Sequence, residues 1–218
     1  MGSDFITHLI YFLGMLLLIT SFGIIASPML LACIRFYAMH SFLLALITLA
    51  MAYHHQLWHL SVAAVLTFVL KVITIPRIFS TVVRRLGIRR EAESYINIPF
   101  SLFVAIFLVS VSFYATSGKT LSALSSLRFL PIAISTVFLG MLVMSTRKKA
   151  ITQVLGLLLM ENGLFLMGIT MTFGMPLLVE LGIFFDVLIG IIIMGIFIFK
   201  IRSAFEGIEV DHMTVLKG

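Results

Sequence analysis

The chain has 218 residues, of which 61% are hydrophobic and 11% are charged, and its mean hydropathy is +1.19. This composition excludes an ordinary soluble domain and predicts an all-α, polytopic transmembrane helical bundle. The net charge of +6 lies mostly at the ends of apolar runs, so it indicates membrane topology and not nucleic-acid binding. The single cysteine, Cys33, excludes an internal disulfide and cannot alone hold an iron–sulfur cluster or a structural zinc.

Apolar runs of roughly 20 residues recur along the chain, and each is long enough to cross about 30 Å of hydrocarbon. The first run has no basic residue before it and is too long for a signal-peptide core, so we expect it to be retained as a helix. We predict seven membrane spans, near residues 5–26, 28–52, 57–80, 97–116, 124–146, 150–173 and 177–200.

Basic residues are distributed unevenly between the two sides of such a seven-span chain. Ten lie on one side, in the loop after residue 83, at residues 147–149 and from Lys200 onward. The other side has only Lys119 and Arg128. The positive-inside rule therefore places the N-terminus outside the cell and the C-terminus in the cytoplasm.

Several ionisable residues fall inside the predicted spans, where each costs a few kcal/mol on insertion scales and needs a partner or a function. Counted from the predicted cytoplasmic helix ends, Lys71, Glu161 and Asp186 lie about 18–21 Å deep, and His40 about 18 Å deep. Four titratable side chains from four helices thus share one level. A lateral proton path requires such a level, because protons pass only between groups joined by hydrogen bonds or by one or two waters.

Other interpretations of these residues remain open. Lys71 with one acid could form a static ion pair that sets helix register, and His40 could be a polar residue bonded to a neighbouring helix. Arg35 and Arg77 are expected to extend toward the lipid headgroups. Pro76 is expected to kink the third span one turn after Lys71 and to free carbonyl groups that could hold water. We assign no catalytic, cofactor-binding or metal-binding residue.

Two segments carry a family resemblance: "QVLGLLLMENGLFLMGITM" and "LVELGIFFDVLIGIIIMGIFIFKIR". They resemble the second and third helices of the K subunit of complex I (NADH:quinone oxidoreductase) and of the matching C subunit of multisubunit cation/proton antiporters. Each of these K-subunit helices carries a membrane-embedded glutamate on the proton path. By motif position Glu161 matches the first glutamate and Asp186 the second. Aspartate is one methylene shorter, so its contact with the next group is expected to depend more on water.

The whole chain, with its four additional N-terminal spans and basic third loop, resembles the hydrogenase-4 component E family. That resemblance implies a membrane subunit of a formate hydrogenlyase-type group 4 nickel–iron hydrogenase in the cell membrane of a prokaryote. It implies antiporter-like and quinone-subunit-like neighbours and a peripheral hydrogenase arm. That arm would carry the nickel–iron site and the clusters, so we expect no cofactor and no catalysis in this chain.

We therefore expect three regions: a four-helix membrane region at 1–123, a region resembling the K subunit at 124–203 and a cytoplasmic tail at 204–218. The leading hypothesis is a subunit that conducts protons, or Na⁺, along midplane residues. The alternative is a structural subunit whose polar residues only hold helices together. A standalone secondary transporter is less favoured, because the sequence has no internal inverted repeat and no matching pair of broken helices.

Overall fold

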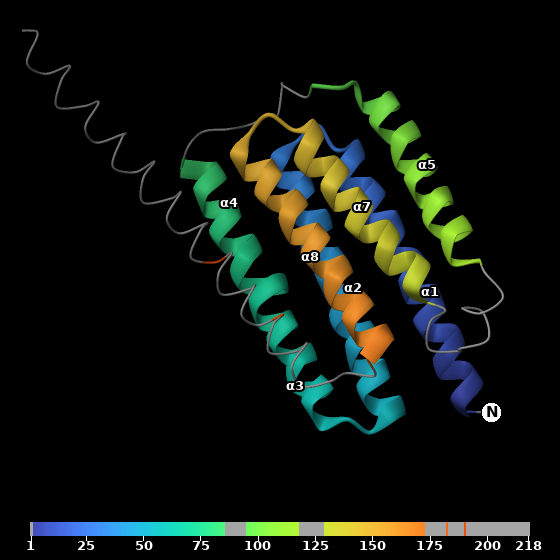
Figure 1. Ribbon diagram of the computed structural model, residues 1–218. Coiled ribbons are helices and arrows are strands. Elements are labelled where there is room, and N and C mark those ends of the chain that lie inside the picture. The colour runs from blue at the N-terminus through green and yellow to red at the C-terminus, as the bar shows by residue number, and fades with distance from the viewer. Residues whose placement is uncertain (1, 86–94, 118–128, 173–181, 183–189, 191–218) are drawn as a thin grey trace, which may run out of the picture.

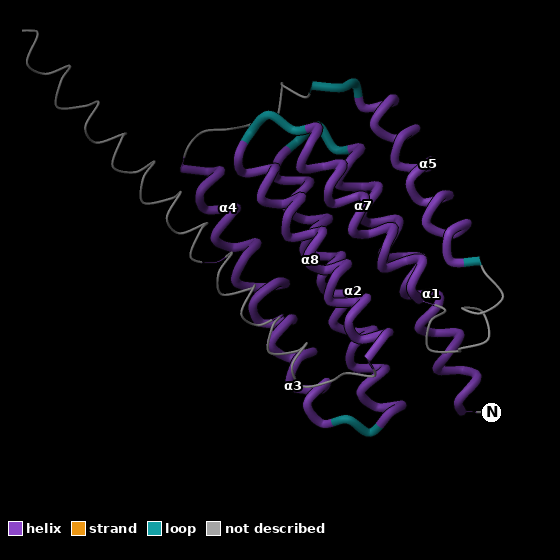
Figure 2. The backbone as a smooth tube through the Cα atoms, viewed as in Figure 1, coloured by secondary structure: helices purple, strands orange, loops and turns teal. Residues whose placement is uncertain are grey.

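The computed structural model describes residues 2–85, 95–117 and 129–172, together with Gly182 and Gly190. Within these residues every regular element is a helix and there is no strand, as Figure 2 shows. The elements are α1 (Gly2–Ala26), α2 (Leu30–His55), α3 (Trp58–Thr67), η1 (Phe68–Thr74), α4 (Ile75–Arg85), α5 (Ile98–Thr116), α7 (Leu130–Thr146) and α8 (Ala150–Thr172).

Five helical stretches are long and apolar enough to cross a membrane: His8–Ala26, Leu30–His54, Trp58–Thr81, Ile98–Thr116 and Ala150–Met171. The helix Leu130–Thr146 is apolar but has 17 residues, slightly fewer than the roughly 20 that usually span a bilayer. The described residues therefore confirm the prediction of an all-helical protein with several helices able to cross a membrane.

The count of seven spans and the orientation of the termini are not supported by the described residues and stay predictions. The predicted seventh span at 177–200, which includes Asp186, lies outside them except for Gly182 and Gly190. The first residues of the predicted fifth span also lie outside the described part, and the described helix there begins at Leu130.

The third predicted span is a continuous rod made of α3, η1 and α4 (Figure 1). Its middle section, η1, is a π-helix of seven residues that ends two residues before Pro76. The Ile75 N–H accordingly bonds to the carbonyl of Leu70, five residues earlier. Because a proline ring collides with the carbonyl four residues before it, we interpret the wider π-helical turns as the local accommodation of Pro76. π-Helical segments recur at functional sites, and this one carries Lys71.

The helices α7 and α8 form a closely packed pair near the middle of the view in Figure 1. A Cβ atom added at Gly156 of α8 would lie 2.6 Å from the backbone nitrogen of Met144, and one at Gly140 of α7 would collide with the backbone of Met160. Small residues at both positions therefore let the two backbones approach closely. At about 100° per residue, the side of α8 that carries Glu161 lies well away from the Gly156 contact.

The opposite side of α8 faces α2 and η1, and α2 is the central helix, in contact with α1, α3, η1, α4 and α8. The turns at one end of the bundle are joined by Arg147, which is buried. Its guanidinium donates to the carbonyls of Ile25 (2.8 Å) and Ser27 (3.2 Å) at the C-terminal end of α1. Sequence reasoning placed Arg147 in a basic cluster; the structure shows that it also satisfies carbonyl groups that a helix end leaves without intrahelical partners.

Candidate functional site

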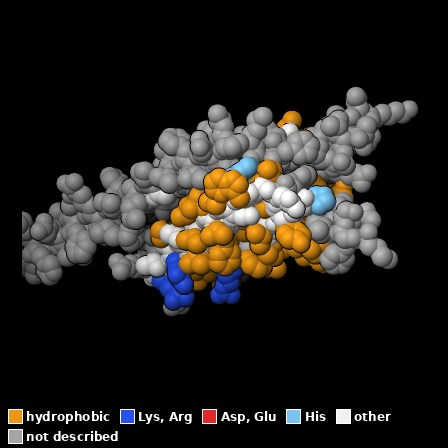
Figure 3. Space-filling view, turned by 90° about the horizontal axis from the view of Figure 1, so that it is seen from below, with side chains coloured by type: hydrophobic (Ala, Val, Ile, Leu, Met, Phe, Trp, Pro, Cys, Tyr) orange, Lys and Arg blue, Asp and Glu red, His pale blue; other side chains and the backbone are white. Residues whose placement is uncertain are grey.

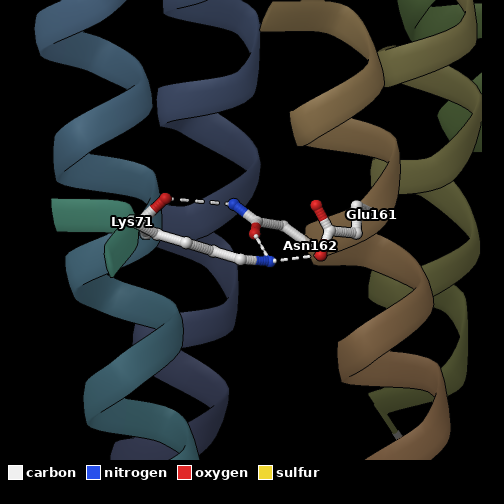
Figure 4. A network of polar contacts seen from close by, with 4 residues as sticks. Lys71, Glu161 and Asn162 are labelled. Carbon is white, nitrogen blue, oxygen red and sulfur yellow. Dashed lines mark hydrogen bonds and ion pairs between the residues drawn. The ribbon is translucent and has the colours of Figure 1, made fainter. Parts of the chain in front are cut away.

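The candidate site is centred on Lys71, a cation buried between helices with 1% of its surface exposed. Its ammonium nitrogen lies 3.0 Å from Oε1 of Glu161 and 3.0 Å from Oδ1 of Asn162 (Figure 4). The ring centroid of Phe165, one turn further along α8, lies 5.9 Å from the same nitrogen. A single helix, α8, thus supplies a carboxylate, an amide oxygen and an aromatic ring to one buried cation.

Asn162 extends this network to a third helix. Its amide nitrogen donates to Oγ of Ser41 on α2 at 3.1 Å, while its amide oxygen accepts from Lys71. Asn162 and Ser41 are 1% and 0% exposed. Because the oxygen of the amide faces an ammonium that can only donate, the two bonds define which way the amide is turned. The residues Lys71, Glu161, Asn162 and Ser41 are called the buried polar network below.

The buried polar network has no net charge when Lys71 and Glu161 are both ionised, which is the form that best offsets the cost of burying each charge. Transfer of one proton from the ammonium to the carboxylate breaks an N–H bond, forms an O–H bond and leaves two neutral groups. The net charge is the same before and after this transfer. The pair can therefore change its protonation without placing an uncompensated charge in the membrane.

His40 lies next to Ser41 on α2, is fully buried, and faces α1. Its Nδ1 atom lies 3.2 Å from Oγ1 of Thr20, 3.2 Å from Oγ of Ser21 and 3.2 Å from the carbonyl oxygen of Leu17. Both hydroxyl groups also donate to the Leu17 carbonyl. Three oxygen acceptors around Nδ1 favour the tautomer with the proton on Nδ1, which leaves the Nε2 lone pair available. Nε2 is buried and has no hydrogen-bond partner in the described part of the chain.

Three of the four residues predicted to share one level are thus placed by the structure. Lys71 and Glu161 are in direct contact. Within the described residues His40 makes no hydrogen bond to Lys71 or Glu161. The next residue of α2, Ser41, belongs to the buried polar network through its hydrogen bond from Asn162. Asp186 lies outside the described residues. Whether these residues relay protons stays a prediction.

Comparison of the sequence with known proteins shows which proteins the chain is similar to. The chain is 25% identical over 206 residues to hydrogenase-4 component E of Escherichia coli K12, which covers 94% of this chain and 95% of that protein. The chain is thus similar to hydrogenase-4 component E along nearly its whole length. The corresponding proteins of Escherichia coli O157:H7 and Shigella flexneri match to the same extent.

A shorter match of 31% identity over 136 residues links the chain to an uncharacterized protein of Mycobacterium tuberculosis. That match spans 59% of each of the two chains. No family model and no solved structure matches the sequence. The similarity to component E therefore rests on sequence alignments that span nearly the full length of both proteins.

Sequence reasoning missed two members of the buried polar network, Asn162 and Ser41. Each is a polar residue inside an apolar span and directly follows a residue that was singled out, Glu161 or His40. Their position beside these two residues was the sequence feature that could have indicated them. A one-residue step turns a helical side chain by about 100°, so the sequence alone did not indicate which of two adjacent polar residues faces a given neighbour.

The other charged residues considered in the sequence lie outside the buried polar network. Arg35 and Arg77 are exposed, as expected for side chains that extend toward headgroups. Within the described residues no group of three or more His, Cys, Asp or Glu side chains is close enough to hold a metal ion.

Proposed function

We propose that the chain is an integral membrane subunit of a complex I-like, group 4 nickel–iron hydrogenase of formate hydrogenlyase type. In this proposal its midplane ionisable residues take part in translocation of protons, or of Na⁺, driven by redox chemistry in other subunits. The similarity to hydrogenase-4 component E over 94% of the chain supports membership of a hydrogenase complex. The observation that supports the role is the buried ion pair of Lys71 and Glu161.

The proposed assembly follows the family resemblance. The neighbours are antiporter-like and quinone-subunit-like membrane subunits and a peripheral hydrogenase arm, all in the cell membrane of a prokaryote. The chain crosses that membrane seven times, with its N-terminus outside and its C-terminus in the cytoplasm. Glu161 and Asp186 pass protons along the midplane, and Lys71 and His40 tune or extend the path.

The physical argument for a relay is that the pair is costly to bury and chemically able to exchange a proton. Ionisable residues inside a membrane bundle are expensive, and they commonly mark ion pathways. Redox chemistry that changes the charge at one end of the membrane arm would alter the pairing of Glu161, and the change would pass to its neighbours. The hydrogen bond that Lys71 donates to Oδ1 of Asn162 provides a second contact that can hold the lysine when Glu161 is protonated.

A purely structural role is the second candidate, and the bond between Asn162 and Ser41 favours it. That bond joins α8 to α2 without any titratable group. Interhelical hydrogen bonds of this kind stabilise membrane bundles by about 0.6–2 kcal/mol each. A structural network and a relay network make the same static contacts, so they differ only in what happens when the charges are removed together.

The test compares the wild-type complex with the double variant Lys71→Met/Glu161→Gln in sealed membrane vesicles. Replacing both partners avoids leaving one uncompensated charge in the bilayer. We measure the amount of assembled complex, the rate of hydrogen turnover and the number of protons moved per hydrogen molecule. The relay predicts an assembled complex that still turns over hydrogen, with protons moved per hydrogen molecule strongly reduced.

A matched control is Thr48→Val, which removes a buried hydroxyl of α2 whose hydrogen bond, among the described residues, is to the carbonyl of Leu44 in the same helix. This variant is expected to keep the wild-type proton stoichiometry. An assembled double variant that moves as many protons per hydrogen molecule as the wild type contradicts the relay and supports the structural role.

A further inference from the structure

We propose that a groove between α2 and the η1–α4 segment binds the phosphate headgroup of an anionic phospholipid. The groove has a volume of about 310 Å³, at the lower end of the range for small-ligand sites. It is called the arginine groove below. Its lining residues are Leu31, Ile34, Arg35, Ala38, Val72, Ile73, Pro76, Arg77, Ser80 and Arg84.

Three arginines converge on this groove from two antiparallel segments. Arg77 and Arg84 are seven residues apart on α4, so they lie on one face of that helix, about two turns apart. Arg35 comes from the facing side of α2. Guanidinium groups form two parallel hydrogen bonds with a phosphate, and this makes arginine the favoured residue for phosphate recognition. Three of them around one cavity form a site for an anion that carries several oxygens.

The protein supplies no counter-charge to these arginines within the described residues. No ion pair or side-chain hydrogen bond of Arg35, Arg77 or Arg84 occurs there, and no acidic residue lines the groove. Figure 3 shows Lys and Arg side chains gathered along one border of a described surface that is otherwise largely apolar. The three guanidinium groups therefore remain available to an anion from outside the described part of the chain.

The surface beside the arginine groove indicates that this anion is attached to acyl chains. Further along α2 and η1, away from the arginine end, lie Met39, Phe42, Phe68 and Val69, whose side chains are 52%, 40%, 38% and 45% exposed. The rings of Phe42 and Phe68 bridge the two helices, with centroids 6.1 Å apart. Cationic groups at the membrane end and an exposed apolar strip deeper in the bilayer match the order of headgroup and acyl chains in a phospholipid.

The location of the groove fits the same occupant. It lies where α2 begins and α4 ends, the end predicted to face the cytoplasm, and basic pockets between membrane helices on that side bind anionic headgroups. A free phosphate ion would use the arginines but would gain nothing from the apolar strip. Snorkelling of single arginines would not require a groove lined by both α2 and the η1–α4 segment. Both alternatives are distinguished from a lipid site by the experiment.

The experiment measures lipid retained by the purified full-length chain after reconstitution with equimolar phosphatidylglycerol and phosphatidylcholine, by native mass spectrometry. The wild type is expected to retain phosphatidylglycerol selectively. Arg35→Gln/Arg77→Gln is expected to weaken that binding by about thirtyfold, since each basic residue near the surface contributes about a factor of five. The matched control, Lys148→Gln/Lys149→Gln, removes two positive charges at the same end of the bundle outside the groove and is expected to retain the lipid.

A second variant, Ala38→Leu, fills the groove from α2 and keeps all three arginines, so it tests the site even if the double arginine variant does not fold. It is expected to lose phosphatidylglycerol selectivity as well. Equal retention of the two lipids by the wild type contradicts the proposal. So does an equal loss in the arginine variant and its lysine control, or displacement of phosphatidylglycerol by millimolar inorganic phosphate, which would assign the site to the free ion.

Discussion

Lys71 and two arginines of the groove, Arg77 and Arg84, belong to the same helical rod but lie in opposite environments. Lys71 is 1% exposed and is held by two side chains of α8. Arg77, six residues further on, is exposed and has no ion pair within the described residues. A cation far from water must receive its partner from the protein, whereas one near the headgroups can receive it from the membrane. The depth of each cation in the membrane therefore decides the source of its counter-charge. For Lys71 this is another helix of the protein, and for the groove arginines it is the proposed lipid headgroup.

The largest expected effect comes from removing the internal partner of Lys71. Glu161→Leu leaves a buried ammonium without its carboxylate and is expected to destabilise the protein by about 3–5 kcal/mol. Denaturant unfolding in detergent micelles measures this change. The double variant Lys71→Met/Glu161→Leu should recover most of the loss, because an apolar pair of similar volume needs no counter-charge. A double variant as unstable as the single one would show that the charge is not the cause.

A smaller effect is expected where the network is joined by neutral groups. Asn162→Leu removes the second acceptor of Lys71 and the bond to Ser41. We expect a loss of about 1–2 kcal/mol in the same unfolding assay, as for interhelical hydrogen bonds in membranes. Leu164→Ala, at a side chain of α8 that is 48% exposed, serves as the control and should change little. A loss as large as that of Glu161→Leu would mean that the amide, and not the ion pair, dominates the site.

The smallest effect on stability is expected at the arginine groove. Arg77→Gln removes an exposed charge without an ion pair among the described residues, and such surface changes usually stay within about 0.5 kcal/mol. Its free energy of unfolding in a detergent without anionic lipid should equal that of the wild type. In mixed micelles containing phosphatidylglycerol the wild type should gain stability and the variant should gain less, since a ligand stabilises the folded state that binds it.

Most of the helical architecture could be predicted from the sequence because apolar run length is a local property. The predicted spans at 5–26, 28–52 and 97–116 correspond to α1, α2 and α5 within a few residues. For Pro76 the sequence predicted a kink and not the π-helical segment that precedes it in the structure. Either change can accommodate a proline inside a helix.

The candidate site was predictable as a set of charges at one depth but not as a set of contacts. A count of 1.5 Å per residue brought Lys71 and Glu161 to one level, and their separation of 90 positions in the chain gave no further indication that they touch. The rotation of α8 about its axis decides that contact. Close packing of Gly140 and Gly156 against the partner backbones restricts that rotation.

The sequence by itself determined that this protein is helical, that it crosses a membrane several times and that its charges lie at two depths. These properties follow from composition and from the fixed rise of the α-helix. Only the tertiary structure decided that Lys71 is shared between Glu161 and Asn162, that Ser41 completes the network, and that three arginines line one groove. Which side chains meet depends on helix rotation and interhelical spacing, and both are set by packing between segments that are distant in the chain.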